Sequence, residues 1–409
     1  MDDRLSQLLS DLYRNHFGKM VAVLMYHTGI VEIAVAEDIV QEAFALASEK
    51  WHNGIPERPD AWLYKTIRNT AYNLLKKEGR QFDHNLMADD QHSESEQESL
   101  RVLFGFIQPE LTPKVQLIIA LRNVSGLKVQ RIAALLASDE NTITKILYRW
   151  KIQRKSQNLN LSVSVTDPGE QKIRTALKIL YLMFTEGYRL SDDGQLNDET
   201  LCEDALCLAK EMVNLKICAN GEVKSLYALM LYNLARASSR LNALNELIPL
   251  AEHDRSGWNQ QMIGVANQYF LQSQKESTNL EMYQLEASIA YLHITAQTFQ
   301  QTKWHLIIRL YDKLMVCNPS PFTALSHAAA LYFSGDHASA LKILDQLKSN
   351  PFFQTNHLLH CLYAKIALHK NDHTNAVTSF KKALNCKLST LEMNFVKKEL
   401  QLVDMHLTR

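Results

Sequence analysis

Hydrophobic residues recur at intervals of three and four along almost the whole chain of 409 residues. Between 34 and 51, the apolar positions are Ala36, Ile39, Val40, Ala43, Phe44 and Ala47. Between 62 and 75, they are Trp62, Ile67, Ala71, Leu74 and Leu75. This spacing puts each set on one side of an α-helix. Because Gly (13) and Pro (9) are also scarce, the pattern predicts an all-α fold.

The C-terminal part contains a weak internal repeat with an offset of 36 residues. Ala340, Leu344 and Leu347 recur as Ala376, Phe380 and Ala383, and Gly335 in the preceding turn corresponds to Asn371. Small and large residues at this spacing are typical of the second helix of a tetratricopeptide (TPR) unit. The Trp and Tyr positions of the full TPR pattern are absent, so an irregular helical domain remains the alternative.

Over the whole chain the formal charge is balanced, with 44 Lys and Arg against 44 Asp and Glu. Within individual segments it is not balanced. Residues 82–99 hold six acidic and no basic residues, residues 100–158 hold ten basic and three acidic, and residues 159–409 hold 24 of each. We therefore expect a domain over 1–81, an acidic and flexible linker over 82–99 and a basic domain over 100–158. A large neutral domain is expected over 170–409, after the turn signal Asp167-Pro168-Gly169.

The composition also limits the class of protein. Hydrophobic residues make up 46% of the chain and charged residues 22%, which excludes a disordered chain and a polycationic tail protein. No run reaches the roughly 18 apolar residues of a membrane span. The first residues, Met1-Asp2-Asp3-Arg4, lack the features of a signal peptide. We expect a cytoplasmic protein without a membrane partner.

The segment 127–155 has the pattern of a helix-turn-helix. Its first helix would carry the apolar residues Ile132, Ala133, Leu135 and Leu136. Ala137-Ser138 would form the turn, and Ser138 or Asp139 can cap the second helix. The second helix would direct Ile143, Ile146 and Leu147 inward and its polar and basic residues outward. Such a helix fits the major groove of DNA, with basic residues on phosphates.

Motifs that precede this segment make the interpretation as a DNA-binding protein more specific. The chain reads Ala36-Glu37-Asp38-Ile39-Val40-Gln41-Glu42-Ala43-Phe44, and later Pro59-Asp60-Ala61-Trp62-Leu63-Tyr64 and Arg68-Asn69. These motifs resemble region 2 of extracytoplasmic-function (ECF) sigma factors, which belong to the sigma-70 family of RNA polymerase subunits. Residues 113–122 and 127–155 then resemble region 4 of that family. The resemblance implies a region 2 helical bundle, a region 4 helix-turn-helix domain and a role in promoter-specific transcription initiation.

The resemblance also implies roles for individual residues. Core RNA polymerase would be contacted by Asp38, Gln41 and Glu42. The −10 region of promoter DNA would be contacted by the loop residues Trp51, His52 and Asn53 and by Lys65, Arg68, Asn69, Lys76, Lys77 and Arg80. The −35 element would be read by Asn141, Thr142, Thr144, Lys145, Arg149, Lys151 and Arg154. The acidic linker would lead toward the RNA channel.

The rest of the chain resembles the C-terminal extension of one ECF group, which is a TPR-like helical domain. The matching segments include Leu180–Tyr188, Asp254-Arg255-Ser256 with Trp258, and Tyr283–Ala287. Ser326-His327 departs from the Asn-Arg that is usual in this group. A ligand role is open for Glu186, Tyr188, Arg255 and Trp258, although structural cross-links between helices are the simpler interpretation. A protein or peptide partner of the extension is expected.

Residues for catalysis are not found. The chain has no nucleophile paired with a base, no Gly-rich phosphate loop and no complete set of metal ligands. We therefore expect no enzyme activity, no metal and no cofactor. Two alternatives to a sigma factor stay open: a helix-turn-helix regulator, and a TPR scaffold without sigma activity.

Overall fold

The structure is a computed structural model, and it describes residues 2–28, 33–77, 92–108, 110–157, 168–190, 198–276 and 280–407. Within these ranges the regular elements are all helices, apart from a single bridge between Leu241 and Leu247. The expected all-α fold is confirmed. The chain divides into two compact units, which are described separately.

The first unit comprises Met1–Glu186 and Thr200–Cys218. Its helices are α1 (Asp2–Thr28), α2 (Ile33–Lys50), the 3-10 turn η1 (Trp51–Asn53), α3 (Pro59–Lys77), α4 (His92–Phe106), α5 (Pro113–Asn123), α6 (Val129–Leu135), α7 (Glu140–Gln157), α8 (Gly169–Tyr188) and α9 (Glu199–Asn214).

The second unit comprises Gly187–Glu199 and Ala219–Arg409. Its helices are α10 (Gly221–Ala235), α11 (Gln260–Glu276), α12 (Met282–Thr295), α13 (Trp304–Cys317), α14 (Pro321–Ser334), α15 (His337–Lys348), α16 (Pro351–Gln354), α17 (His357–His369), α18 (His373–Leu384) and α19 (Thr390–Leu407). Short 3-10 turns η3 (Ala237–Arg240), η4 (Leu250–Glu252) and η5 (Arg255–Gly257) lie between α10 and α11.

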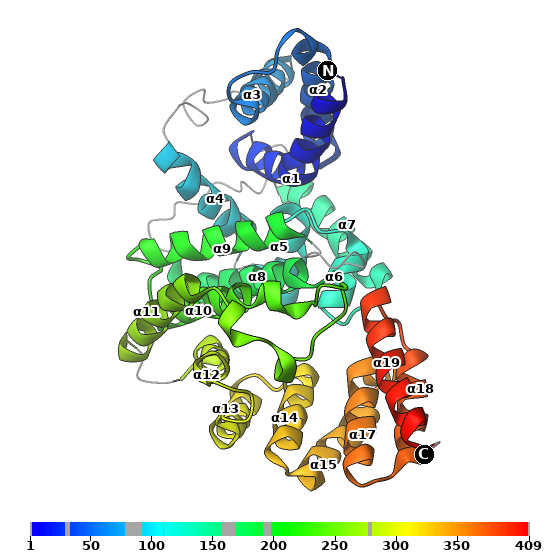
Figure 1. Cartoon of the computed structure of the whole chain (residues 1–409). Coiled ribbons are helices and arrows are strands. Elements are labelled where there is room, and N and C mark those ends of the chain that lie inside the picture. Colours follow the sequence, from blue (N-terminus) through cyan, green and yellow to red (C-terminus); the bar gives the residue numbers. More distant parts are fainter. Residues whose placement is uncertain are drawn as a thin grey trace. The chain divides into compact units, whose positions relative to one another are not determined.

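Helices α1, α2 and α3 form a bundle at the N-terminus (Figure 1). Its core contains the predicted apolar stripe of α2, which is buried from Ala36 to Ala47, and Leu63, Ile67 and Ala71 of α3 are fully buried against it. Burying one Leu or Ile side chain stabilises the fold by about 1.5–3 kcal/mol. The apolar periodicity therefore decides which side of each helix faces the core.

The structure corrects the expected linker over 82–99. Helix α4 begins at His92, so residues 92–99 are helical, while 82–91 lie outside the described residues. The end of α4 supplies the physical reason, because Leu100, Leu103 and Phe104 are fully buried. A helix anchored there can extend toward its N-terminus through Glu and Gln, which are good helix formers.

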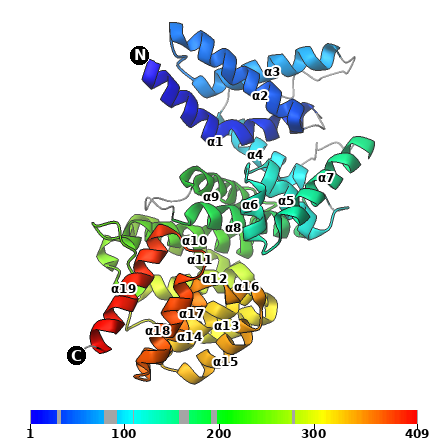
Figure 2. The same ribbon diagram turned by 90° about the vertical axis from the view of Figure 1, so that its right-hand side faces the viewer.

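The internal repeat of the second unit appears in the backbone. Helices α14 and α15 form one hairpin and α17 and α18 another (Figures 1 and 2). Gly335 and Asn371, which are 36 residues apart, both adopt left-handed backbone conformations, with φ of 93° and 57°. Asp336 and Asp372 follow them and accept a hydrogen bond from the backbone N–H three residues later. The sequence repeat thus corresponds to a repeated turn and helix cap.

The boundary between the two units differs from the predicted boundary at residue 170. Most of α8, together with α9, groups with the N-terminal unit rather than with the rest of the extension. The functional limits of the domains stay predictions, but the packing does not separate the extension from the preceding helices at that point.

The left-handed turn at Gly335 generates a stability prediction. Replacing Gly335 by Ala should lower the free energy of unfolding by about 1 kcal/mol, because an L side chain is strained at this φ. A Cβ at this position meets no atom within 4 Å, so the loss would come from the backbone alone. The measurement is urea unfolding followed by circular dichroism.

Gly264, within α11 and likewise surrounded by open space, is the matched control. Gly264→Ala should stabilise the protein by about 0.5–1 kcal/mol, since Ala is the better helix former. If Gly335→Ala and Gly264→Ala change the free energy of unfolding equally, backbone strain at Gly335 is not the cause of its loss.

Candidate nucleic-acid interface

One polar face of α2 points away from the bundle core. Asp38, Gln41 and Glu42 are all exposed, while Ile39 and Val40 between them are buried. Positions separated by three and four residues are neighbours on a helix surface. The three residues predicted to bind core polymerase therefore form one continuous polar and acidic patch.

The turn after α2 differs from the prediction at one residue. Trp51 is only 3% exposed and its ring packs edge-on against Trp62 with the centroids 5.4 Å apart. Trp51 thus packs in the core, whereas the predicted contact with DNA would need its side chain at the surface. His52 and Asn53 are exposed. These two residues remain the candidates for a DNA contact from this turn.

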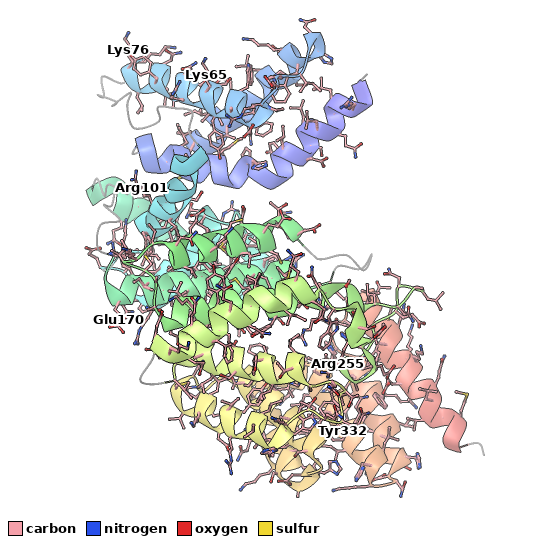
Figure 3. The ribbon with its side chains drawn as sticks, turned by 60° about the vertical axis from the view of Figure 1, so that its left-hand side comes forward. Lys65, Lys76, Arg101, Glu170, Arg255 and Tyr332 are labelled. Atoms are coloured by element: carbon pink, nitrogen blue, oxygen red, sulfur yellow. The ribbon has the colours of Figure 1, made fainter. Side chains whose placement is uncertain are left out.

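The outer face of α3 is basic. Lys65, Asn69, Lys76 and Lys77 are exposed and Arg68 is half-buried. The ammonium group of Lys76 lies 5.8 Å from the centre of the Tyr72 ring. Figure 3 shows Lys65 and Lys76 on α3, pointing away from the bundle. The eleven helical steps from Lys65 to Lys76 correspond to about 16 Å of helix. The last predicted residue of this group, Arg80, lies outside the described residues.

Helices α6 and α7 lie in the segment predicted to be a helix-turn-helix, and a short turn joins them. Ala137 adopts a left-handed conformation with φ 46°, and the backbone N–H of Ser138 donates to the carbonyl of Ala133 over 2.9 Å. This bond is the C-terminal cap that ends a helix at a left-handed residue. The turn at Ala137-Ser138 is therefore as predicted.

Asp139 is the residue that caps α7. Its carboxylate accepts a hydrogen bond from the backbone N–H of Thr142 at 2.8 Å and another from the Thr142 hydroxyl at 2.6 Å. The two bonds from Thr142 favour the ionised form and lower the pKa of Asp139. The hydroxyl of Thr144 similarly donates to the Glu140 carbonyl at 2.8 Å. Both threonines thus use their donors within the helix.

The remaining residues of α7 separate into two faces. Ile143 and Trp150 are buried, whereas Asn141, Thr144, Lys145 and Arg149 are exposed, with Thr142 and Lys151 half-buried. Arg154 lies in α7, but its side chain is outside the described part. The exposed side presents cationic groups and polar side chains in an arrangement that suits the major groove.

Sequence reasoning missed two residues on the exposed side of α7. Tyr148 is 65% exposed and Ile152 is 51% exposed. Tyr148 lies three positions after Lys145 and directly before Arg149. This spacing puts Tyr148 on the same side of the helix as the two basic residues, and it could have identified Tyr148 from the sequence. An exposed aromatic side chain among basic ones can contact sugar or base edges.

An ion pair joins α6 to α8 within the first unit. Arg131 donates to the carboxylate of Glu186, which is only 1% exposed. A carboxylate buried to this extent needs a partner, because removing a charge from water is costly. Glu186, for which a ligand role was open, therefore has a structural contact with the helix-turn-helix.

The other three candidates of the extension also act within the fold of the second unit. The hydroxyl of Tyr188 donates to the Asn233 carbonyl over 2.9 Å. Arg255 donates to the carbonyls of His293 and Ala296 at the end of α12 and stacks over the ring of Trp258. These contacts support the structural interpretation, in which the side chains connect helices.

Comparisons with known proteins agree with part of this description. Residues 12–81 match the model of sigma-70 region 2, and residues 172–274 match a family of unknown function, DUF6596. An uncharacterized protein of Rhizobium meliloti (strain 1021) is 28% identical over 343 residues, which is 80% of each chain. No solved structure matches significantly. In the described part of the chain, no helix is long and apolar enough to span a membrane.

The match to region 2 covers the bundle that carries the acidic patch of α2 and the basic face of α3. It supports membership of the sigma-70 family and a role like that of a sigma factor in transcription initiation. Sigma-70 proteins act as non-enzymatic subunits of the transcription machinery, and this role implies binding to core RNA polymerase.

The ion pair between the exposed Arg131 and the buried carboxylate of Glu186 generates a prediction. Replacing Arg131 by Met should lower the free energy of unfolding of the first unit by about 1–3 kcal/mol, because it removes the cation that faces a buried carboxylate. The measurement is urea unfolding of the full chain. Adding Glu186→Gln should restore part of the loss, since the buried side chain then carries no charge.

Arg174 is the matched control. It pairs with Glu170 over 2.8 Å on the exposed surface of α8. Its replacement by Met should cost no more than about 0.5 kcal/mol. If Arg131→Met and Arg174→Met lose equal stability, the pair between Arg131 and Glu186 is no stronger than a surface pair.

Proposed function

We propose that the protein is a sigma factor of the ECF type, which binds core RNA polymerase and directs promoter-specific transcription initiation. One observation carries the proposal: the sigma-70 region 2 match lies on a bundle with Asp38, Gln41 and Glu42 exposed on one helix and a basic face on another. An apolar core with two differently charged outer faces is suited to bind a protein and a nucleic acid at the same time.

The basic face of α3 would bind the opened strand near the −10 element. Lys65, Lys76 and Lys77 can neutralise phosphates, while His52 and Asn53 at the adjoining turn offer polar contacts to an unstacked base. Unstacking a base costs a few kcal/mol, and a basic surface with a base-binding turn can offset that cost.

Helix α7 would read the −35 element. Its N-terminal residue Asn141 would reach base edges, and Lys145 and Arg149 would contact phosphates or guanine. We include the exposed Tyr148 in this surface. At neutral pH the Asp139 carboxylate is ionised and accepts two hydrogen bonds from Thr142, so the helix end that approaches DNA stays capped.

The C-terminal extension would support region 4 rather than mask it. One observation favours support: Arg131, in the segment predicted to be a helix-turn-helix, is paired with Glu186 of the extension. Binding of a protein or peptide to the TPR-like part would then modulate region 4. If Arg131→Met strengthens promoter binding instead of weakening it, the extension masks DNA-binding residues and the supporting role is wrong.

Reconstituted transcription tests the proposal. Core RNA polymerase mixed with the purified chain and a promoter library should produce transcripts from a defined subset of promoters. Glu42→Lys should reduce this transcription about tenfold or more, because a loss of about 1.4 kcal/mol in core binding is tenfold in affinity. Asp11→Lys, the same charge reversal on an exposed position of α1, is the control and should leave transcription unchanged.

The outcome also separates the alternatives. A helix-turn-helix regulator would bind promoter DNA but give no transcripts with core polymerase alone. A scaffold would do neither. Either result overturns sigma activity.

DNA binding by α7 can be tested through its salt dependence. The double variant Lys145→Ala, Arg149→Ala should weaken binding to the selected promoters and reduce the slope of log K against log salt by about 2, since each lost phosphate contact contributes about 0.9. Fluorescence anisotropy at several salt concentrations measures both quantities.

The control is Arg174→Ala, Lys178→Ala, which removes two cations from exposed positions of α8. Its slope should match that of the unmodified protein. An equal change in both variants would mean that net charge, rather than α7, determines binding.

A further inference from the structure

The second unit contains a cavity of about 420 Å³. Four segments that are distant in sequence form its walls: the loop 247–249, helix α14, helix α17 and helix α19. The lining is mostly aliphatic and aromatic, with Leu247, Ile248, Leu325, Leu362, Phe395 and Val396 as its main apolar residues. A volume of this size lies in the range of small-molecule sites, roughly 300–1,000 Å³.

The loop wall of the cavity is held in place by specific bonds. Asn242 accepts hydrogen bonds from the backbone N–H groups of Leu244 and Glu246, each at 2.9 Å. A backbone bridge connects Leu241 and Leu247. The ammonium group of Lys398 lies 3.0 Å from the Glu246 carboxylate and so ties the loop to α19. The site is therefore largely formed before any ligand arrives, which reduces the entropy cost of binding.

The charged groups of the lining already have partners. Lys365 pairs with Glu399 over 3.1 Å. Glu392 accepts a hydrogen bond from the backbone N–H of Ser389 at 2.9 Å and lies 3.6 Å from the imidazole of His357. Burial is the main cause of a lowered pKa at His357, which favours its neutral form. The lining thus has no unpaired charge that calls for an ionic ligand.

One apolar side chain at the cavity is left facing solvent. Leu358 on α17 lines the cavity and is 55% exposed. A ligand seated in the cavity can cover this side chain and gain from removing its surface from water.

We infer that this cavity binds an uncharged, mainly apolar small molecule, with Ser326 and His357 as its polar contacts. A peptide segment fits the lining less well. Each peptide unit brings a backbone N–H and a C=O that need partners, whereas the walls offer few polar groups besides those two residues. The inference does not depend on sigma activity, so its failure would leave the proposed function intact.

Binding of a neutral fluorescent probe tests the inference. N-phenyl-1-naphthylamine, which is apolar and uncharged, should bind the full-length protein saturably with an increase in fluorescence. Ala329 of α14 lines the cavity. Ala329→Phe, which places a ring there, should weaken binding at least about tenfold. The anionic probe 8-anilinonaphthalene-1-sulfonate should bind more weakly than the neutral probe.

A milder pair of variants controls for misfolding of Ala329→Phe. Leu358→Ser should weaken the neutral probe about threefold to tenfold, in line with the loss of one exposed apolar contact. Leu244→Ser changes an exposed residue of the same loop that does not line the cavity, and it should leave binding unchanged. Circular dichroism melting checks that both variants are folded.

Three results would overturn the inference. The first is the absence of saturable binding of the neutral probe. The second is equal binding by Leu358→Ser and Leu244→Ser. The third is tighter binding of the anionic probe than of the neutral one. Selection of peptides that bind the full chain but not Ala329→Phe, without any probe binding, would assign the cavity to a protein segment instead.

Discussion

Burial of one apolar stripe per helix is the interaction on which the arrangement of this protein depends. In α2, the stripe from Ala36 to Ala47 enters the core. With 3.6 residues per turn, this burial leaves Asp38, Gln41 and Glu42 no direction except outward. In α7, the burial of Ile143 and Trp150 exposes Lys145 and Arg149 in the same way. The polar surfaces are thus a direct consequence of the packing of the apolar ones.

A second constraint is the ion pair between Arg131 and Glu186, which connects two helices that the charge pattern assigns to different domains. Net charge along the chain indicates a basic domain that ends near residue 158 and a neutral one that begins near 170. The packing continues across this point, because Glu186 is buried and paired with Arg131, and α9 groups with the first unit. The first helix of the extension is part of the surroundings of the helix-turn-helix. If the extension regulates region 4 as proposed, this shared packing is the route that the structure offers.

The second unit combines a repeated hairpin with an irregular segment. Both hairpins turn through a left-handed residue and an Asp cap, at Gly335-Asp336 and at Asn371-Asp372. The segment between α10 and α11, by contrast, consists of 3-10 turns and a bridged loop that is anchored on α19. The cavity lies between these two kinds of structure. Helical hairpins supply rigid walls, and the anchored loop completes the enclosure.

Features that depend on neighbouring residues could be predicted from the sequence. The all-α fold, the stripe of α2, the turn at Ala137-Ser138 and the repeat that relates Gly335 to Asn371 all follow from interactions over a few residues. Those interactions are helical periodicity, capping and left-handed turn geometry, and the chain carries their signals directly.

Features that depend on distant contacts were decided only by the tertiary structure. Trp51 is in the core, where Trp62 packs against it, and residues 92–99 belong to a helix whose other end is buried. The partner of Glu186 lies 55 residues away, and the cavity needs four separate segments. A local pattern specifies that a side chain is apolar or charged. Which group it meets is determined by long-range packing.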